Sequence, residues 1–272
     1  MGAWAEDLAR IRADLHVHTV LSPCADVEMI PPLIVQRALE LGLGLIAVTD
    51  HNSSENCAAV IRAARGTTLT VMPGMEVQTR EEVHVLCLFD EVEQALAWQG
   101  IVCDHLPGQR NPEELLGAQY VVDSEGSYLR TECRLLSTST DLALDEVVSR
   151  ARALGGLAIP AHIDRPSYSL LANLGLIPPG LDVPALEIFR LTDPGQLLEE
   201  QPGLRAWTLI RGGDAHRLSE LKWALNLKMR GATTNELLMA LAGQAERSCS
   251  LAPLTHPQKP DMMNVIVSQG SL

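Results

Sequence analysis

Short apolar runs and amphipathic segments follow one another in the first third of the chain. The apolar runs that predict strands lie at 11–18, 44–49, 68–72 and 83–89. Helices are predicted at 31–41, which begins with Pro31, and at about 53–65, where Ser53 or Ser54 can cap the first turn. Strand, helix and strand repeated in this order predict a parallel sheet.

This pattern breaks between about residues 104 and 140. Residues 119–123 and 127–131, joined by Ser124-Glu125-Gly126, predict a β-hairpin outside the sheet, as a lid or an oligomer contact. The alternation then resumes, with predicted strands and helices at 144–154, 157–160, 185–189, 207–210 and about 234–245. We therefore expect one α/β domain over residues 1–272, with an inserted excursion at about 104–140. The C-terminal tail, 256–272, shows no pattern that predicts an element.

Histidine and carboxylate side chains gather at the ends of the predicted strands. Nine of them stand there: His16, His18, Asp26, His51, Glu76, His84, His162, Asp214 and His216. His16 and His18 lie two apart on a strand, so both imidazoles project from one face. A solvated strand face is the alternative, but similar endings recur at Asp50-His51 and Asp214-Ala215-His216. Mixed nitrogen and oxygen ligands suit zinc, manganese or iron, and α/β barrels keep their chemistry at strand ends. The pattern predicts a multinuclear metal hydrolase.

Composition and charge narrow the class of protein. The hydrophobic content of 46% is enough for a substantial core, and no apolar run reaches the roughly 18 residues that span a bilayer. Because the N-terminus also lacks a basic region followed by an apolar stretch, we expect a cytoplasmic enzyme without a membrane partner. The net charge of -13 makes long nucleic acid an unlikely partner, although bound cations would reverse the potential inside an acidic cleft.

The six cysteines form no CxxC pair, and we expect them to be reduced and mostly buried. Cys24 lies between His18 and Asp26 and could touch the site. We do not count it as a ligand, because thiolates in closed zinc sites usually arrive in spaced pairs.

Five short motifs resemble the successive motifs of the PHP (polymerase and histidinol phosphatase) superfamily, in the family's order. They are Asp14-Leu15-His16-Val17-His18, Thr49-Asp50-His51-Asn52, Gly74-Met75-Glu76-Val77, Pro160-Ala161-His162 and Gly213-Asp214-Ala215-His216. Each motif alone is weak, but the ordered set is specific. The resemblance implies a distorted (β/α)7 barrel with metals at the C-terminal ends of the strands, and phosphoester hydrolysis as the activity.

The resemblance also implies three metal sites. The first would be held by His16, His18, Glu76 and Asp214. The second would share Glu76 with His84 and His162. The third would take Asp26, His51 and His216. The segment Ser22-Pro23-Cys24-Ala25-Asp26 departs from the family's commoner Ser-Asp-Gly sequence, which concerns the third site alone.

The expected reaction is hydrolysis of a phosphoester in a small phosphorylated metabolite or nucleotide, with two to three divalent zinc, manganese or iron ions. A hydroxide that bridges two metals would be the nucleophile, because metals lower the pKa of water to roughly 7. We expect Glu76, Asp214 and Arg165 to be catalytic. Arg165 and Arg190 are expected to bind the substrate phosphate, since guanidinium groups bind phosphate in a bidentate manner, and Arg80 is a weaker candidate.

Several points stay open. Asp14 and Asp50 either orient ligand histidines or merely end a strand or cap a helix. His105 could approach the cleft, and His256 is expected on the surface or in the core. An amidohydrolase-type C–N bond hydrolase and a non-catalytic, metal-stabilised regulatory PHP domain are the alternative functions. Neither the substrate nor the oligomeric state follows from the sequence.

Overall fold

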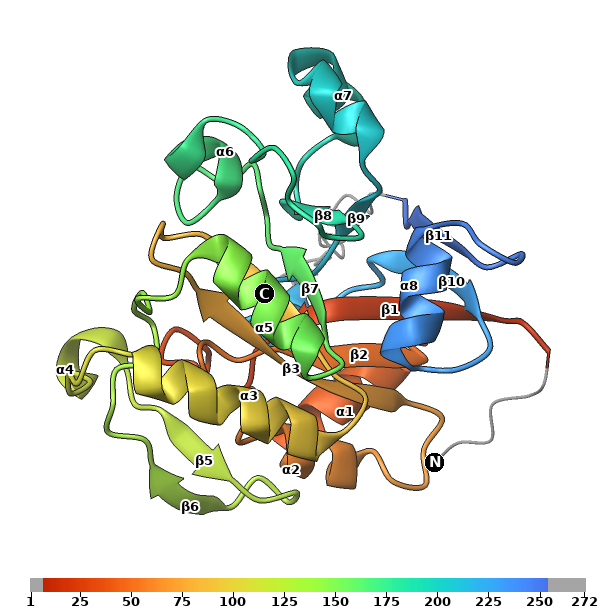
Figure 1. The fold of residues 1–272 in the computed structure, drawn as a ribbon. Coiled ribbons are helices and arrows are strands. Elements are labelled where there is room, and N and C mark those ends of the chain that lie inside the picture. Colours follow the sequence, from red (N-terminus) through yellow and green to blue (C-terminus); the bar gives the residue numbers. More distant parts are fainter. Residues whose placement is uncertain (1–6, 254–272) are drawn as a thin grey trace, which may run out of the picture.

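The computed structural model describes residues 7–253, and its centre is a curled seven-stranded sheet with helices on its outer side (Figure 1). Along the sheet the strands follow the order β11-β10-β1-β2-β3-β4-β7. Their bounds are Ala9–Val17 (β1), Leu45–Val48 (β2), Thr70–Gln78 (β3), His84–Leu88 (β4), Leu157–Pro160 (β7), Leu225–Met229 (β10) and Ser248–Leu251 (β11). A parallel pair, β8 (Leu186–Ile188) and β9 (Leu209–Arg211), lies beside β7 and β11. This is the predicted α/β fold, a distorted barrel.

The direction of the strands differs from the fully parallel sheet that the alternation predicts. Strands β1, β2 and β3 are parallel, but β4 is antiparallel to β3 and to β7, and β10 is antiparallel to β1. Only the short segment 79–83 joins β3 to β4, and a parallel crossover needs a dozen or more residues. The parallel prediction is therefore wrong for β4. His84 is the first residue of β4 and pairs with Gln78 at the end of β3, so it still reaches the edge where β3 ends.

Eight α-helices lie in the described residues. Their bounds are Pro31–Glu40 (α1), Cys57–Ala63 (α2), Val92–His105 (α3), Glu113–Leu116 (α4), Leu144–Ala153 (α5), Leu170–Leu174 (α6), Pro194–Glu200 (α7) and Thr234–Leu241 (α8), with short 3₁₀ helices at Pro202–Ala206 and Leu218–Glu220. Helices α2 and α3 pack on β3, α5 packs on β4 and β7, and α8 packs on β10 and β11. Within residues 7–253 no helix is long and apolar enough to cross a membrane.

The predicted hairpin is confirmed as β5 (Tyr120–Val122) and β6 (Tyr128–Thr131), an antiparallel pair apart from the main sheet. The side chain of Asn56 fastens it to the barrel, because its Nδ2 donates to the carbonyl of Tyr120 at 3.0 Å and its Oδ1 accepts from the Val122 amide at 3.1 Å. The excursion therefore lies against the loop that follows β2. Its role as a lid or an oligomer contact stays a prediction. The tail 256–272, with His256, lies outside the described residues.

Aliphatic side chains from most of the strands meet inside the curl. Leu15 of β1, Met72 of β3, Leu86 of β4, Ile159 of β7 and Ile210 of β9 belong to one buried cluster. Because β9 contributes to the same cluster as β1 and β7, the β8–β9 pair closes the curl into a barrel-like body. One end of this body carries the polar residues described next.

Candidate metal centre

Eight of the nine predicted ligands come together at one end of the barrel. His16 and His18 close β1, His51 follows β2, and Glu76 ends β3 beside the start of β4. The remaining four are His84, His162, Asp214 and His216. All are buried except His216, which is partly exposed. The segment 214–216 reaches β1 because the Ala215 amide donates to the His16 carbonyl at 3.2 Å and the His18 amide donates to the Ala215 carbonyl at 3.0 Å.

The donor atoms of the predicted first metal site are spaced like the ligands of a tetrahedral metal ion. The Nε2 atoms of His16 and His18 face each other at 3.2 Å. His16 Nε2 lies 3.2 Å from Glu76 Oε1 and 3.4 Å from Asp214 Oδ1, and His18 Nε2 lies 3.5 Å from the same Asp214 oxygen. A tetrahedral zinc ion with ligands at about 2.0–2.1 Å separates them by about 3.3–3.4 Å. The four side chains therefore fit one divalent cation.

Glu76 lies at the centre of the remaining ligands. Its Oε1 is 2.9 Å from His84 Nδ1 and 3.1 Å from His162 Nε2, and its Oε2 is 3.0 Å from His51 Nδ1. The same carboxylate also contacts the first site, so it can serve two cations at once. A third group of donor atoms, from His18, His51 and His216, lies within 4.8 Å of one another.

Buried polar atoms without a hydrogen-bond partner among the described residues cluster at this centre. They are His84 Nε2 and His162 Nδ1, together with His51 Nδ1, Glu76 Oε2 and Asp214 Oδ1, which have ion-pair contacts of 3.0–3.5 Å but no hydrogen bond. Each such atom costs about 1–3 kcal/mol when it stays unpaired. Divalent cations would satisfy several of them, so the residues present fit the metal ions that the sequence predicts.

The electrostatics of the cluster keep Glu76 ionised and act in opposite directions on its histidines. Burial raises the pKa of Glu76, but the charges of His84, His16 and His51 outweigh it and hold the pKa well below the usual value. Burial lowers the pKa of His84 to about 4, against the attraction of Glu76. Burial, helped by the nearby charge of His216, also holds the pKa of His18 well below its usual value. Burial also lowers the pKa of His16 and His51, but nearby charges, of Glu187 and Glu76 for His16 and of Cys24 and Glu76 for His51, outweigh it and hold both pKa values well above the usual value. Metal binding would displace protons from these two imidazoles, because a ligand imidazole is neutral.

Removal of bound metal is expected to lower the melting temperature by about 5–10 °C. A ligand that binds only the folded state at about 100 times its Kd stabilises it by about 2.7 kcal/mol, and a chain of this size gains about 2–4 °C per kcal/mol. Thermal unfolding before and after chelation and dialysis measures the change, and added zinc or manganese should restore it. An unchanged melting temperature after verified metal removal would contradict the assignment.

The carboxylate of Glu187, which is not among the residues predicted from the sequence, orients the ring of His16. The Nδ1 of His16 lies 3.0 Å from Glu187 Oε2, and the same oxygen accepts from the His162 amide at 3.0 Å. Glu187 is buried in β8, so it fixes the ring of His16 and the position of His162 together. The sequence signal for this role was that Glu187 is a charged residue in the middle of the apolar run 185–189.

Asp14 and Asp50 both support the site, in different ways. Asp50 accepts from Ser22 Oγ at 2.7 Å, and Ser22 Oγ lies 2.9 Å from His18 Nδ1, so Asp50 acts on a ligand through a serine. Within residues 7–253, the Asp14 carboxylate makes no hydrogen bond to an imidazole ring. It accepts instead from backbone amides, including Gly213 at 2.8 Å, and thereby holds the 213–216 segment against β1. Its burial raises its pKa to about 6.

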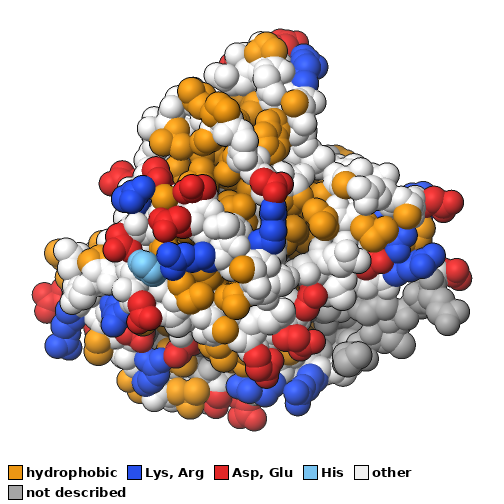
Figure 2. Space-filling view, viewed as in Figure 1, with side chains coloured by type: hydrophobic (Ala, Val, Ile, Leu, Met, Phe, Trp, Pro, Cys, Tyr) orange, Lys and Arg blue, Asp and Glu red, His pale blue; other side chains and the backbone are white. Residues whose placement is uncertain are grey.

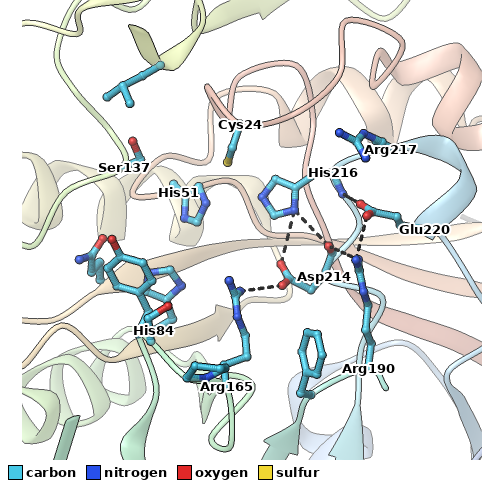
Figure 3. Close-up of a pocket in the computed structure, with 16 residues that line it drawn as sticks. Cys24, His51, His84, Ser137, Arg165, Arg190, Asp214, His216, Arg217 and Glu220 are labelled. Carbon is cyan, nitrogen blue, oxygen red and sulfur yellow. Dashed lines mark hydrogen bonds and ion pairs between the residues drawn. The ribbon is translucent and has the colours of Figure 1, made fainter. Parts of the chain in front are cut away.

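Asp26 is not brought into the cluster, which corrects the expected third site. Its side chain is exposed, and Oδ1 accepts from the backbone amide of Glu28 at 3.2 Å, two residues ahead in the same turn. Only its backbone approaches the site, through an amide that donates to the His216 carbonyl at 2.8 Å. Cys24, two residues earlier, lines the cavity beside His51 and His216 instead (Figure 3).

A cavity of about 780 Å³ opens above the metal ligands. Figure 3 shows Arg165 and Arg190 reaching it from below and Arg217 from the side. Arg165 Nη1 donates to Asp214 Oδ2 at 2.9 Å, and Arg190 Nη2 donates to Glu220 Oε1 at 2.9 Å. The cavity thus brings three guanidinium groups to the metal ligands, one of which, Arg217, the sequence analysis does not identify.

Arg80 and His105, the weaker candidates for this site, lie outside the cluster. Arg80 is exposed and pairs with Glu81 at 3.8 Å, and it does not line this cavity. His105 Nδ1 pairs with Asp141 Oδ1 at 2.5 Å at the end of α3. Neither side chain takes part in the site.

Comparison with known proteins agrees with this geometry. Residues 14–125 match the family model of the PHP domain. The 5'-3' exoribonuclease Rnm of Escherichia coli (strain K12) is 27% identical, over 59% of this chain and 67% of that protein. The lesion-specific endonuclease EndoQ of Pyrococcus furiosus shares the fold, with a TM-score of 0.66 and 19% identity over 89% of this chain. A second endonuclease Q structure, a complex with a 27-mer duplex substrate, has a TM-score of 0.65 and 17% identity over 88% of this chain. The chain spans 58% of each endonuclease Q chain.

The prediction that long nucleic acid is an unlikely partner is wrong. An exoribonuclease is among the relatives, and an endonuclease of the same fold has been solved on a DNA duplex. The net charge of -13 misleads because it averages over the whole surface. On the face seen in Figure 2, basic and acidic side chains are interspersed, and the cavity itself carries three arginines.

Proposed function

We propose that this chain, which carries a PHP domain over residues 14–125, is a metal-dependent phosphoester hydrolase that acts on nucleic acid or on short oligonucleotides. One observation carries the proposal. A single buried carboxylate, Glu76, lies within 2.9–3.4 Å of ring nitrogens from five histidines, directly below a cavity lined by arginines. Phosphate esters are anionic. A cation-binding cluster at the base of the cavity and arginine side chains around it would both attract such a substrate.

The arginines, the His and Glu cluster and the supporting carboxylates have different roles in the proposed reaction. Arg165 is held in place by Asp214, and its other N–H groups have no partner within residues 7–253, so they can bind a nonbridging phosphate oxygen. Arg190 is held by Glu220 on the same wall. Cations held by the His and Glu cluster would stabilise the charge on the phosphate oxygens and lower the pKa of an attacking water. Glu187 and Asp50 keep the imidazoles in fixed orientations while this happens. Two to three ions of zinc, manganese or iron fit this set.

The walls of the cavity favour a nucleotide-containing substrate over a small sugar phosphate. The Tyr168 ring stacks on His84 with centroids 5.1 Å apart and is 41% exposed, and Phe189 lines the same cavity. Exposed aromatic faces are where bases of single-stranded nucleic acid stack. The volume of about 780 Å³ lies in the range of about 300–1,000 Å³ that small-molecule sites occupy, so the end of a strand fits. A small phosphorylated metabolite is the competing substrate.

The test compares three substrate classes on one metal-loaded preparation of the full chain. End-labelled RNA and DNA oligonucleotides, a panel of small phosphomonoesters and a panel of amides are each incubated with zinc, manganese or iron. We expect metal-dependent cleavage of oligonucleotides with the highest kcat/KM. Preferred hydrolysis of monoesters would redirect the substrate to metabolites, and amide hydrolysis alone would replace the proposal by a C–N bond hydrolase.

Replacing Arg165 by Ala is expected to raise KM for phosphorylated substrates by about 10–100-fold, because a charge-assisted hydrogen bond contributes about 1.5–3 kcal/mol. Steady-state kinetics with metal analysis of the same sample measures it. Arg152→Ala is the matched control, since Arg152 pairs with Asp182 on the surface, away from the cavity. Loss of metal from Arg165→Ala would show that the guanidinium only supports Asp214.

A further inference from the structure

Cys24 occupies the place at the mouth of the site that the sequence analysis gives to Asp26. It is one of the residues that line the cavity, together with His51 and His216. Figure 3 shows its sulfur directed towards the two imidazole rings. Cys24 is exposed at the mouth of this cavity. The side chain is thus a soft donor aimed at two nitrogen donors.

The local fold makes this placement firm. The Ser22 amide donates to the Thr19 carbonyl at 3.1 Å, and the Ala25 amide donates to the Ser22 carbonyl at 2.9 Å, so residues 19–25 form consecutive turns. Gly117 of the excursion lies against the carbonyl of Pro23, where a Cβ would collide with it. These contacts hold Cys24 from both sides. The Asp26 carboxylate is exposed and accepts from the Glu28 amide at 3.2 Å.

The imidazole rings beside Cys24 belong to a separate group of donor atoms. His51 is 93% buried, and its Nδ1 lies 3.0 Å from Glu76 Oε2, so only its other ring nitrogen remains for the third site. His18, His51 and His216 offer donor atoms within 4.8 Å of one another. The rings of His51 and His216 lie 5.7 Å apart, centre to centre. Cys24 lines the cavity beside two of these three imidazoles.

We propose that the Cys24 thiolate, with His51 and His216, binds the third metal ion of this centre, and that this makes the third site selective for zinc over manganese. The inference rests on the metal-dependent function proposed above. On binding, the thiol releases its proton to solvent and the sulfur donates an electron pair to the cation. Thiolate with imidazole is a ligand set that zinc prefers, whereas manganese prefers oxygen ligands.

Zinc K-edge X-ray absorption of the zinc-loaded full chain tests the proposal independently of activity. We expect a sulfur shell at about 2.3 Å beside nitrogen and oxygen at about 2.0–2.1 Å. Cys24→Ser should lose the sulfur shell and about one zinc per chain. Cys24→Asp should lose the shell but keep the zinc, because a carboxylate is also a zinc ligand. Cys133→Ser is the matched control, since Cys133 is exposed and lies outside the cavity.

The outcomes separate this inference from the function on which it rests. Zinc bound only by nitrogen and oxygen in the wild-type protein would overturn the role of Cys24 and leave the phosphoesterase proposal standing. A sulfur shell that persists in Cys24→Ser would assign the sulfur to another cysteine and overturn it too. A protein that binds no zinc would overturn both. The wild-type spectrum decides the question even if a variant fails to fold.

Discussion

Replacing Glu76 by Gln is expected to lower the turnover of the metal-loaded protein by about 10²–10⁴-fold and to reduce its metal content. Removing one partner of a buried charged cluster costs about 3–5 kcal/mol, and each 1.36 kcal/mol is tenfold in rate. Glu76 has no exposed surface, and its two oxygens contact ring nitrogens on all sides. The amide of Gln keeps the shape but replaces one acceptor oxygen by a donor that points at imidazoles.

The measurement is kcat together with metal analysis of the same sample. Glu93→Gln is the matched control, because Glu93 is exposed in the first turn of α3 and should leave both quantities unchanged. Far-ultraviolet circular dichroism checks that the Glu76 variant is folded. Full turnover by a folded Glu76→Gln protein would rule out a shared ligand at this position.

The substitution Gly212→Ala is expected to destabilise the protein by about 1–3 kcal/mol and to reduce activity by about 100-fold, although it replaces no predicted ligand. A Cβ at this position would collide with the carboxylate of Glu187 and lie 2.5 Å from the Cβ of His16. Overpacking a filled site typically costs that much free energy, and a displacement of about 1 Å in a catalytic group costs about 100-fold in rate. The glycine is therefore required by the close approach of β9 to β1 and β8.

Chemical denaturation gives the free energy of unfolding, and kinetics at saturating metal gives the activity. Gly231→Ala is the control, since no atom lies within 4 Å of a Cβ there. If Gly212→Ala lost stability but kept full activity, the position of Glu187 and His16 would not limit the reaction. Equal behaviour of the two variants would contradict the packing argument.

The gathering of the histidines and Glu76 at one place was predictable from the sequence because strand ends meet at one edge of a barrel. The apolar runs were enough to predict the positions of four residues, because these runs are strands in the structure. The four residues are His16, His18, Glu76 and His162. His84 was placed correctly for a different reason. It begins an antiparallel strand, and the pattern of apolar residues does not distinguish the two directions of a strand.

Other features depend on contacts that no local pattern records. Asp26 and Cys24 are two residues apart in a turn, and which of them faces the cavity is decided by backbone hydrogen bonds and by Gly117, far along the chain. Strands β10 and β11 were missed because they are stabilised by pairing with β1 and with each other. Helix α3 was missed as well, since only Ala95, Trp98 and Val102 mark its buried face.

The metal dependence of this protein is tested most directly by its metal content, measured by elemental analysis of the untreated protein on the sample used for the oligonucleotide assay. We expect two to three transition-metal ions per chain, and loss of cleavage in proportion to their removal by a chelator. A protein with no bound metal after reconstitution, or one that cleaves oligonucleotides equally well without metal, would contradict this expectation.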